Sequence, residues 1–129
     1  MDINQINILT VGRLAKAKGI HLAIEACKIL KSKGNKLKWY VIGEGPERNE
    51  LKKTIKEYKL ENSFHLLGYK ENPYPYIKSC DIYTQTSLFE GLGLTVIEAA
   101  ILQKPIVTTN FPTASSIITN NETGLICEM

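Results

Sequence analysis

The sequence is poor in the residues that build metal centres and disulfide frameworks. It has two histidines, His21 and His65, and three cysteines, Cys27, Cys80 and Cys127, without any C-x-x-C pair. An odd number of widely spaced cysteines argues against a disulfide framework and against a zinc site. Two histidines are too few for a convincing metal cluster. The pattern favours a reduced chain with buried thiols.

Long apolar runs are also missing. No run approaches the roughly 20 residues that span a bilayer, and no signal-peptide pattern precedes the first apolar segment. The chain has no repeat, no low-complexity tract and no internal linker. Its 129 residues, 43% of them hydrophobic, suit one globular domain and are too few for two. We therefore expect a single domain over residues 1–129, in the cytoplasm.

Positive charge is only mildly in excess, with a net charge of +3. Lysines gather in two groups on the polar sides of predicted helices or at their exits, where a solvated face is the favoured interpretation. A membrane-surface or nucleic-acid role is the alternative, and no nucleic-acid partner is expected. The two groups are Lys28, Lys31, Lys33, Lys36 and Lys38, then Lys52, Lys53, Lys56 and Lys59.

Strand and helix patterns alternate along the whole chain. Strands are expected at residues 4–11, 37–42, 64–67, 81–86, 105–109 and 124–127. Helices are expected at 19–34, 47–58, 73–79 and 112–119, with one more that contains Glu98 and ends near 103. Such alternation predicts an α/β fold: a doubly wound, Rossmann-like parallel sheet of about six strands with helices on both faces. In the common strand order 3-2-1-4-5-6, strands one and four flank the ligand crevice, which brings the Arg13 loop beside the Glu90 loop.

The stretch at residues 87–100 organises the rest of the chain. It places two glutamates, Glu90 and Glu98, with seven residues between them. Gly91 and Gly93 allow close backbone approach, and the N–H groups of the helix that follows favour an anion. A sugar nucleotide explains a carboxylate beside such a turn, because its phosphates need N–H donors and cations and its hydroxyls need carboxylate acceptors.

Two cations follow the first strand. Arg13 stands in Gly12-Arg13-Leu14, and Lys18 precedes Gly19 at the start of a helix. A diphosphate bound in the crevice would meet both side chains. Plain surface charges are the alternative for this pair.

With the turns at 43–46 and 66–69, these motifs make the chain resemble the carboxyl-terminal, donor-binding half of the retaining glycosyltransferases of the GT-B fold, the large group called group 1. The resemblance covers residues 6–126 and is most specific between Glu90 and Ala99. It implies transfer of a glycosyl group, with retention, from a nucleotide-diphosphate sugar in bacterial polysaccharide biosynthesis. The acceptor would be bound by an amino-terminal domain missing from this chain, so the chain is expected to be a truncated half of a larger enzyme and inactive alone.

The resemblance also implies roles for individual residues. Arg13, Lys18 and Glu90 are the expected catalytic residues: the two cations contact the donor diphosphate, and Glu90 faces the hydroxyls of the donor sugar. Glu98 accepts from the ribose diol. The other expected donor-binding residues have two roles. Gly68 and Tyr69 lie against the nucleobase. The residues that contribute backbone to the phosphate site are Gly12, Gly91, Leu92, Gly93, Leu94 and Thr95.

The resemblance implies that no metal or other cofactor is needed, since the basic pair and the helix dipole do what a divalent cation does in other enzymes.

The chain departs from the family pattern at three places. Leu92 stands where an aromatic is frequent, Thr86 stands where proline often precedes the serine, and residues 111–115 replace a glycine pair followed by a glutamate. The last departure borders the donor sugar, so the sugar is not identified. The resemblance leaves room for peripheral contact of the whole enzyme with the inner face of a membrane.

Several other interpretations remain open. Thr95-x-x-Glu98 is also a helix capping box, and Glu90 is also explained as a solvated turn residue, although an acid beside two glycines lacks an obvious local partner. At the level of function, the alternatives are a sugar-nucleotide epimerase half-domain and a noncatalytic nucleotide-binding or flavodoxin-like signalling module. A nicotinamide-dependent dehydrogenase would need G-x-G-x-x-G after the first strand, and Gly12-Arg13-Leu14-Ala15 does not supply it.

Overall fold

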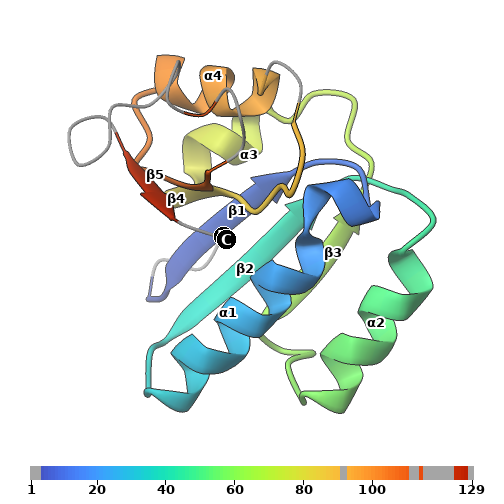
Figure 1. Ribbon diagram of the computed structural model, residues 1–129. Coiled ribbons are helices and arrows are strands. Elements are labelled where there is room, and N and C mark those ends of the chain that lie inside the picture. The colour runs from blue at the N-terminus through green and yellow to red at the C-terminus, as the bar shows by residue number, and fades with distance from the viewer. Residues whose placement is uncertain (1–3, 91–92, 111–113, 115–123, 128–129) are drawn as a thin grey trace.

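The computed structural model describes residues 4–90, 93–110, 114 and 124–127, and its strands form one parallel sheet (Figure 1). The strand order is β3-β2-β1-β4-β5-β6, as the alternation predicts. Neighbouring strands pair in parallel throughout. The strands are β1 (Ile6–Val11), β2 (Leu37–Ile42), β3 (Phe64–Gly68), β4 (Ile82–Gln85), β5 (Ile106–Thr109) and β6 (Leu125–Cys127).

The helices lie close to the predicted positions. They are α1 (Ile20–Ser32), α2 (Arg48–Glu57), α3 (Tyr74–Ser79) and α4 (Leu94–Ile101). A short 3-10 helix, η1 (Lys16–Lys18), precedes α1 and has no counterpart in the sequence prediction. The helix expected at 112–119 falls almost wholly outside the described residues.

Each face of the sheet carries its own apolar core, because successive residues of a strand point to opposite faces. On one face Ile8 packs with Ile24 of α1 and Leu51 of α2. On the other, Leu9 packs with Ile77 and Val96 of α3 and α4. The prediction of helices on both faces is confirmed, and burial on both sides explains why apolar residues of one strand pack into both cores.

The sheet also contains a polar junction at its centre. Thr10 Oγ1 lies 2.6 Å from Thr84 Oγ1 and accepts the indole N–H of Trp39 at 3.1 Å. These bonds satisfy polar groups that burial would otherwise penalise. They also tie β2, β1 and β4 together below the carboxyl ends of the strands.

The cysteines divide into two kinds. Cys27 and Cys80 are buried, and burial raises the pKa of each thiol to about 11. Cys127, in β6, is exposed. The expectation of buried thiols is right for two of the three cysteines and wrong for Cys127. None of the helices in the described part of the chain has the length and apolar character that crossing a bilayer requires.

Candidate functional site

Seven of the predicted site residues gather in one hollow at the carboxyl ends of β1 and β4: Gly12, Arg13, Lys18, Glu90, Gly93, Leu94 and Thr95. These strands are neighbours in the sheet, so the loops that follow them meet at one edge. The hollow has a volume of about 460 Å³. Its lining is Val11, Gly12, Arg13, Lys18, Glu90, Gly93, Leu94 and Thr95. Gly91 and Leu92, which the prediction also assigned to this site, lie outside the described residues.

Backbone contacts hold the two loops against each other. The carbonyl oxygen of Ala17 accepts the N–H of Leu88 at 2.8 Å, and Thr86 Oγ1 donates to the carbonyl of Lys18 at 3.1 Å. Gly19 follows with φ at 59°, and a Cβ there would lie only 2.1 Å from the carbonyl oxygen of Thr86. This close approach requires glycine. It brings the end of η1, and with it Lys18, to the turn that contains Glu90.

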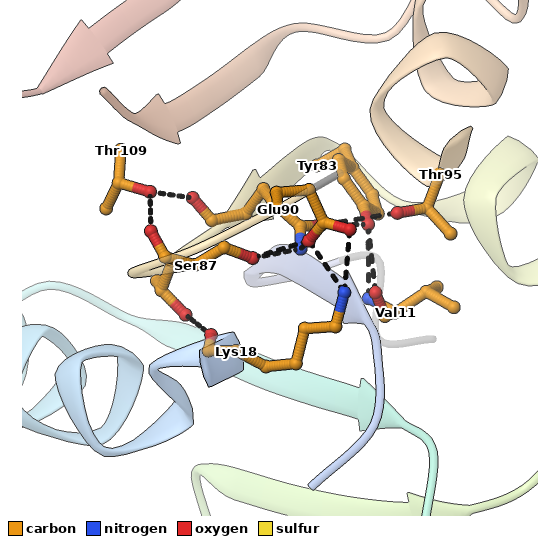
Figure 2. A network of polar contacts seen from close by, with 9 residues as sticks. Val11, Lys18, Tyr83, Ser87, Glu90, Thr95 and Thr109 are labelled. Atoms are coloured by element: carbon orange, nitrogen blue, oxygen red, sulfur yellow. Dashed lines mark hydrogen bonds and ion pairs between the residues drawn. The ribbon is translucent and has the colours of Figure 1, made fainter. Parts of the chain in front are cut away.

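Glu90 is held firmly by local partners. Lys18 Nζ lies 2.7 Å from both carboxylate oxygens of Glu90, and Ser87 Oγ donates to Glu90 Oε2 at 2.8 Å (Figure 2). The Glu90 side chain is only 12% exposed. The expectation that this acid lacks a local partner is therefore wrong, and so is the alternative of a solvated turn residue.

A buried amide connects Glu90 to the core of the sheet. Gln85, the last residue of β4, is 2% exposed, and its Nε2 donates to Glu90 Oε2 at 3.1 Å and to Ser87 Oγ at 2.7 Å. Its Oε1 accepts the hydroxyl groups of Tyr83 at 2.8 Å and Thr95 at 3.3 Å. Burial raises the pKa of Tyr83 well above its ordinary value, so this phenol remains a donor at neutral pH.

The start of α4 forms one wall of the hollow. Gly93 is the N-cap, with φ at 66°, and no side chain caps it. Thr95 is the second residue of the helix, and its hydroxyl bonds to Gln85, so the alternative interpretation of Thr95 and Glu98 as a capping box is wrong. The first N–H groups of a helix lack intrahelical acceptors and favour an anion. Here they face the same hollow as Arg13 and Lys18.

Glu98 occupies a different place from Glu90. It is the fifth residue of α4, in the second turn, and it is half-buried. It does not line the hollow that Glu90 lines. The two glutamates therefore lie at the same edge of the sheet without sharing one pocket.

A second hollow of about 460 Å³ adjoins the first. Both hollows have Val11, Gly12 and Arg13 in their linings, and the second adds Tyr69, a residue that is 71% exposed. Gly68, which precedes it, is buried at the end of β3, and its carbonyl accepts the N–H of Gly43 at 2.9 Å. The predicted nucleobase loop thus lies on the far side of Arg13 from Glu90.

The turn at residues 43–46 supports the Arg13 loop. The N–H of Leu14 donates to the carbonyl of Glu44 at 3.0 Å. A Cβ at Gly43, whose φ is 150°, would lie 1.8 Å from the carbonyl oxygen of Gly12. The backbone of this turn therefore sets the position of Gly12 and Arg13, which is a structural role.

Metal ligands are sparse in this region. Among the residues that the structure describes, no group of three or more His, Cys, Asp or Glu side chains is arranged to hold a metal ion. The expectation that no metal is needed stays a prediction.

Sequence reasoning missed the supporting residues of the site. Gln85, Tyr83 and Ser87 orient the side chains around Glu90, yet none was assigned to it. The available signal was the polar run Thr84-Gln85-Thr86-Ser87 at the end of a buried strand. Polar side chains in a strand buried on both faces need partners, and here the partners belong to the site.

Comparisons with known proteins agree on one family. A family model described as glycosyl transferases group 1 matches residues 2–129. The N-acetylgalactosamine-N,N'-diacetylbacillosaminyl-diphospho-undecaprenol 4-alpha-N-acetylgalactosaminyltransferase of Campylobacter jejuni is 37% identical over 123 residues, which are 95% of this chain and 33% of that protein. This chain spans about a third of that relative's length.

Two solved structures are similar over nearly the whole chain. The TarM mutant of S. aureus, in complex with fondaparinux, alpha-GlcNAc-glycerol and UDP, superposes with a TM-score of 0.92 at 30% identity, over 96% of this chain and 25% of that one. The carboxyl-terminal domain of a glycosyl transferase group 1 family protein from Francisella tularensis gives a TM-score of 0.83 at 28% identity, over 95% of this chain and 67% of that one.

Proposed function

Because the chain belongs to the glycosyl transferases group 1 family, we propose that it binds the nucleotide-diphosphate sugar from which a GT-B glycosyltransferase transfers a glycosyl group. The observation that carries the proposal is the hollow between the β1 and β4 loops. It combines two cations, Arg13 and Lys18, with the start of α4 and the carboxylate of Glu90. A diphosphate joined to a sugar needs this combination of donors and acceptor.

The site supports a specific division of labour. Arg13, Lys18 and the first N–H groups of α4 stabilise the negative charge that develops on the leaving diphosphate, an electrostatic effect of the oxyanion-hole type. Glu90 accepts from the hydroxyls of the sugar. The nucleobase occupies the second hollow beside Tyr69, and Glu98 accepts from the ribose diol. Transfer proceeds with retention and needs no metal, since the cations supply the positive charge.

The names of the similar proteins support a first donor to test. The TarM structure contains UDP together with alpha-GlcNAc-glycerol, and the Campylobacter relative is named as an N-acetylgalactosaminyltransferase. Uridine diphosphate carrying an N-acetylhexosamine is therefore the first candidate donor.

We assign the acceptor to another part of the whole enzyme. The hollow carries groups for a donor, and the chain spans only 33% of the Campylobacter relative and 25% of the TarM chain. The Campylobacter relative's name includes diphospho-undecaprenol, a lipid-linked group. That name supports an enzyme that acts in polysaccharide or glycolipid assembly in the cytoplasm, at the inner face of a membrane.

The proposal is tested by titrating the ¹⁵N-labelled chain with UDP and, separately, with NAD. UDP should shift the amide resonances of Gly12, Arg13 and Thr95, and NAD at the same concentration should not. The hollow between α1 and α2, which His21 and Thr54 line, provides an internal control. Shifts confined to that control hollow, or equal shifts with both ligands, would contradict the proposed function.

A further inference from the structure

Gln85 stands directly behind Glu90, and its amide is buried. We propose that Gln85 is a positioning residue for the donor sugar: it fixes the carboxylate of Glu90 so that one oxygen is anchored in the fold and the other faces the hollow. This inference rests on the proposed function and deepens it. It assigns sugar selectivity to a side chain that does not line the hollow itself.

The neighbours of Gln85 allow only one orientation of its amide. Oε1 accepts the hydroxyl of Tyr83 at 2.8 Å, and Tyr83 is fully buried. Nε2 faces the carboxylate of Glu90 at 3.1 Å. A flipped amide would set a carbonyl oxygen against that carboxylate, with two acceptors in contact and no proton between them. The Tyr83 hydroxyl also lies 3.3 Å from the backbone N–H of Val11, so the chain of bonds starts in the central strand.

The two oxygens of Glu90 have different surroundings. Oε2 accepts from Gln85, from Ser87 at 2.8 Å and from Lys18 at 2.7 Å. Among the described residues, Lys18 alone bonds to Oε1. Oε2 is thus saturated by the fold, whereas Oε1 has one partner, and that partner is a cation suited to phosphate. When a diphosphate attracts Lys18, Oε1 becomes the acceptor that a sugar hydroxyl can use.

The same amide links Glu90 to the phosphate side of the hollow. Thr95, in the first turn of α4, donates to Gln85 Oε1 at 3.3 Å and lines the hollow. Thr109, at the end of β5, donates to the backbone carbonyls of Ser87 and Gln85. Gln85 therefore sets the position of the carboxylate relative to the helix start that receives the phosphates, and that spacing must match one sugar–diphosphate unit.

The decisive variant is Gln85→Glu, which keeps the shape of the side chain and replaces the N–H donor with a carboxylate oxygen. Two carboxylates in contact cannot both stay ionised easily, so the pKa of one of them rises. Near pH 8 the new side chain repels Glu90. As the pH falls through the raised pKa, the protonated form donates to Glu90 Oε2 as the amide does.

The measurement is the ratio of the Kd of UDP to the Kd of UDP-N-acetylglucosamine, taken by calorimetry from pH 5.5 to pH 8. In Gln85→Glu the preference for the sugar-bearing ligand should fall about ten-fold at pH 8, the effect of losing one charge-assisted hydrogen bond, and should recover at pH 5.5. Gln85→Met, which has no donor at any pH, should lose the preference across the whole range. Gln103→Glu makes the same chemical change at an exposed glutamine and should match the parent chain.

Three results overturn the inference, and they are distinguishable. If the parent chain prefers the sugar-bearing ligand and both Gln85 variants keep that preference at every pH, the positioning role of Gln85 is wrong and the proposed function stands. If the parent chain binds neither ligand, the proposed function fails and the inference fails with it. A preference that is lost equally at pH 5.5 and pH 8 in Gln85→Glu would indicate a purely structural role and would also overturn the inference.

Discussion

The ammonium group of Lys18 lies 2.7 Å from both carboxylate oxygens of Glu90. The two residues come from loops at the ends of different strands, and each neutralises the other across the wall of the hollow. A donor that places phosphate on Lys18 and a hydroxyl on Glu90 must divide this pair. The pair therefore disfavours a bare diphosphate, which can replace only one half of it, relative to a sugar-bearing donor, which can engage both.

Removal of the negative charge at position 90 should separate these effects. Glu90→Gln leaves Lys18 without its anionic partner, so the affinity for UDP should rise roughly five-fold, which corresponds to about 1 kcal/mol for a partly exposed ion pair. The preference for UDP-N-acetylglucosamine should fall, because the sugar loses its carboxylate acceptor. Calorimetry on both ligands checks this, with the exposed Glu57→Gln as the matched control. A lower affinity for UDP in Glu90→Gln would contradict the competition between Glu90 and phosphate for Lys18.

The other glutamate should act on the nucleotide instead of the sugar. Glu98→Gln should weaken binding of UDP and of UDP-N-acetylglucosamine by the same factor, because its proposed partner is the ribose common to both. The melting temperature should stay within about 2 °C of the parent, because Gly93 caps α4 and Glu98 does not. A drop in melting temperature without any loss of affinity would return Glu98 to a structural role.

The turn that supports the Arg13 loop should be intolerant of a side chain. In Gly43→Ala the new methyl group would lie 1.8 Å from the carbonyl oxygen of Gly12, so the loop must move or the chain must lose stability. We expect a loss of about 3 kcal/mol or more in the free energy of unfolding, or a clear loss of UDP affinity in a folded variant. Gly34→Ala is the matched control, since Gly34 also has positive φ, at 86°, but has nothing within 4 Å of the added atom. It should cost only about 1–2 kcal/mol, from backbone conformation alone. Chemical denaturation measures both, and equal losses would mean that the predicted overlap does not matter.

The thiols offer a check on the packing of both cores. Burial raises the pKa of Cys27 and Cys80 to about 11, so both remain protonated and shielded at pH 8, where the thiolate is the reactive form. An aromatic disulfide reagent should therefore modify one thiol quickly in the native chain, at the exposed Cys127, and all three after denaturation. Rapid reaction of two or three thiols in the native chain would mean that at least one core is open.

The sequence was sufficient to predict the order of the strands and the meeting of two distant loops. Alternating strand and helix patterns impose right-handed crossovers, and the doubly wound order then brings Arg13 and Glu90 to the same edge. The side-chain partners at that edge were not predictable in the same way. The bond between Gln85 and Glu90 depends on the conformation of the turn between them, and the Lys18–Glu90 pair depends on the close approach of Gly19 to Thr86. No local pattern encodes either contact.

The capping-box alternative for Glu98 fails for a similar reason. Thr95-x-x-Glu98 fits a capping box, but that interpretation assumes that the helix begins at Thr95. Gly93 adopts a left-handed conformation and starts the helix earlier, which carries Thr95 into the first turn and turns its hydroxyl to Gln85. A pattern of residue types cannot distinguish these two starts when glycine precedes the threonine.

The central claim is that the donor diphosphate binds in the hollow beside Arg13, and calorimetry of UDP binding to Arg13→Ala tests it most directly. A charge-assisted contact contributes roughly 1.5–3 kcal/mol, so the variant should bind UDP at least about ten-fold more weakly at fixed salt. Lys36→Ala removes an exposed cation at the opposite edge of the sheet, beside the start of β2, and should bind UDP as the parent chain does. An unchanged affinity in Arg13→Ala, or an equal loss in both variants, would contradict the account.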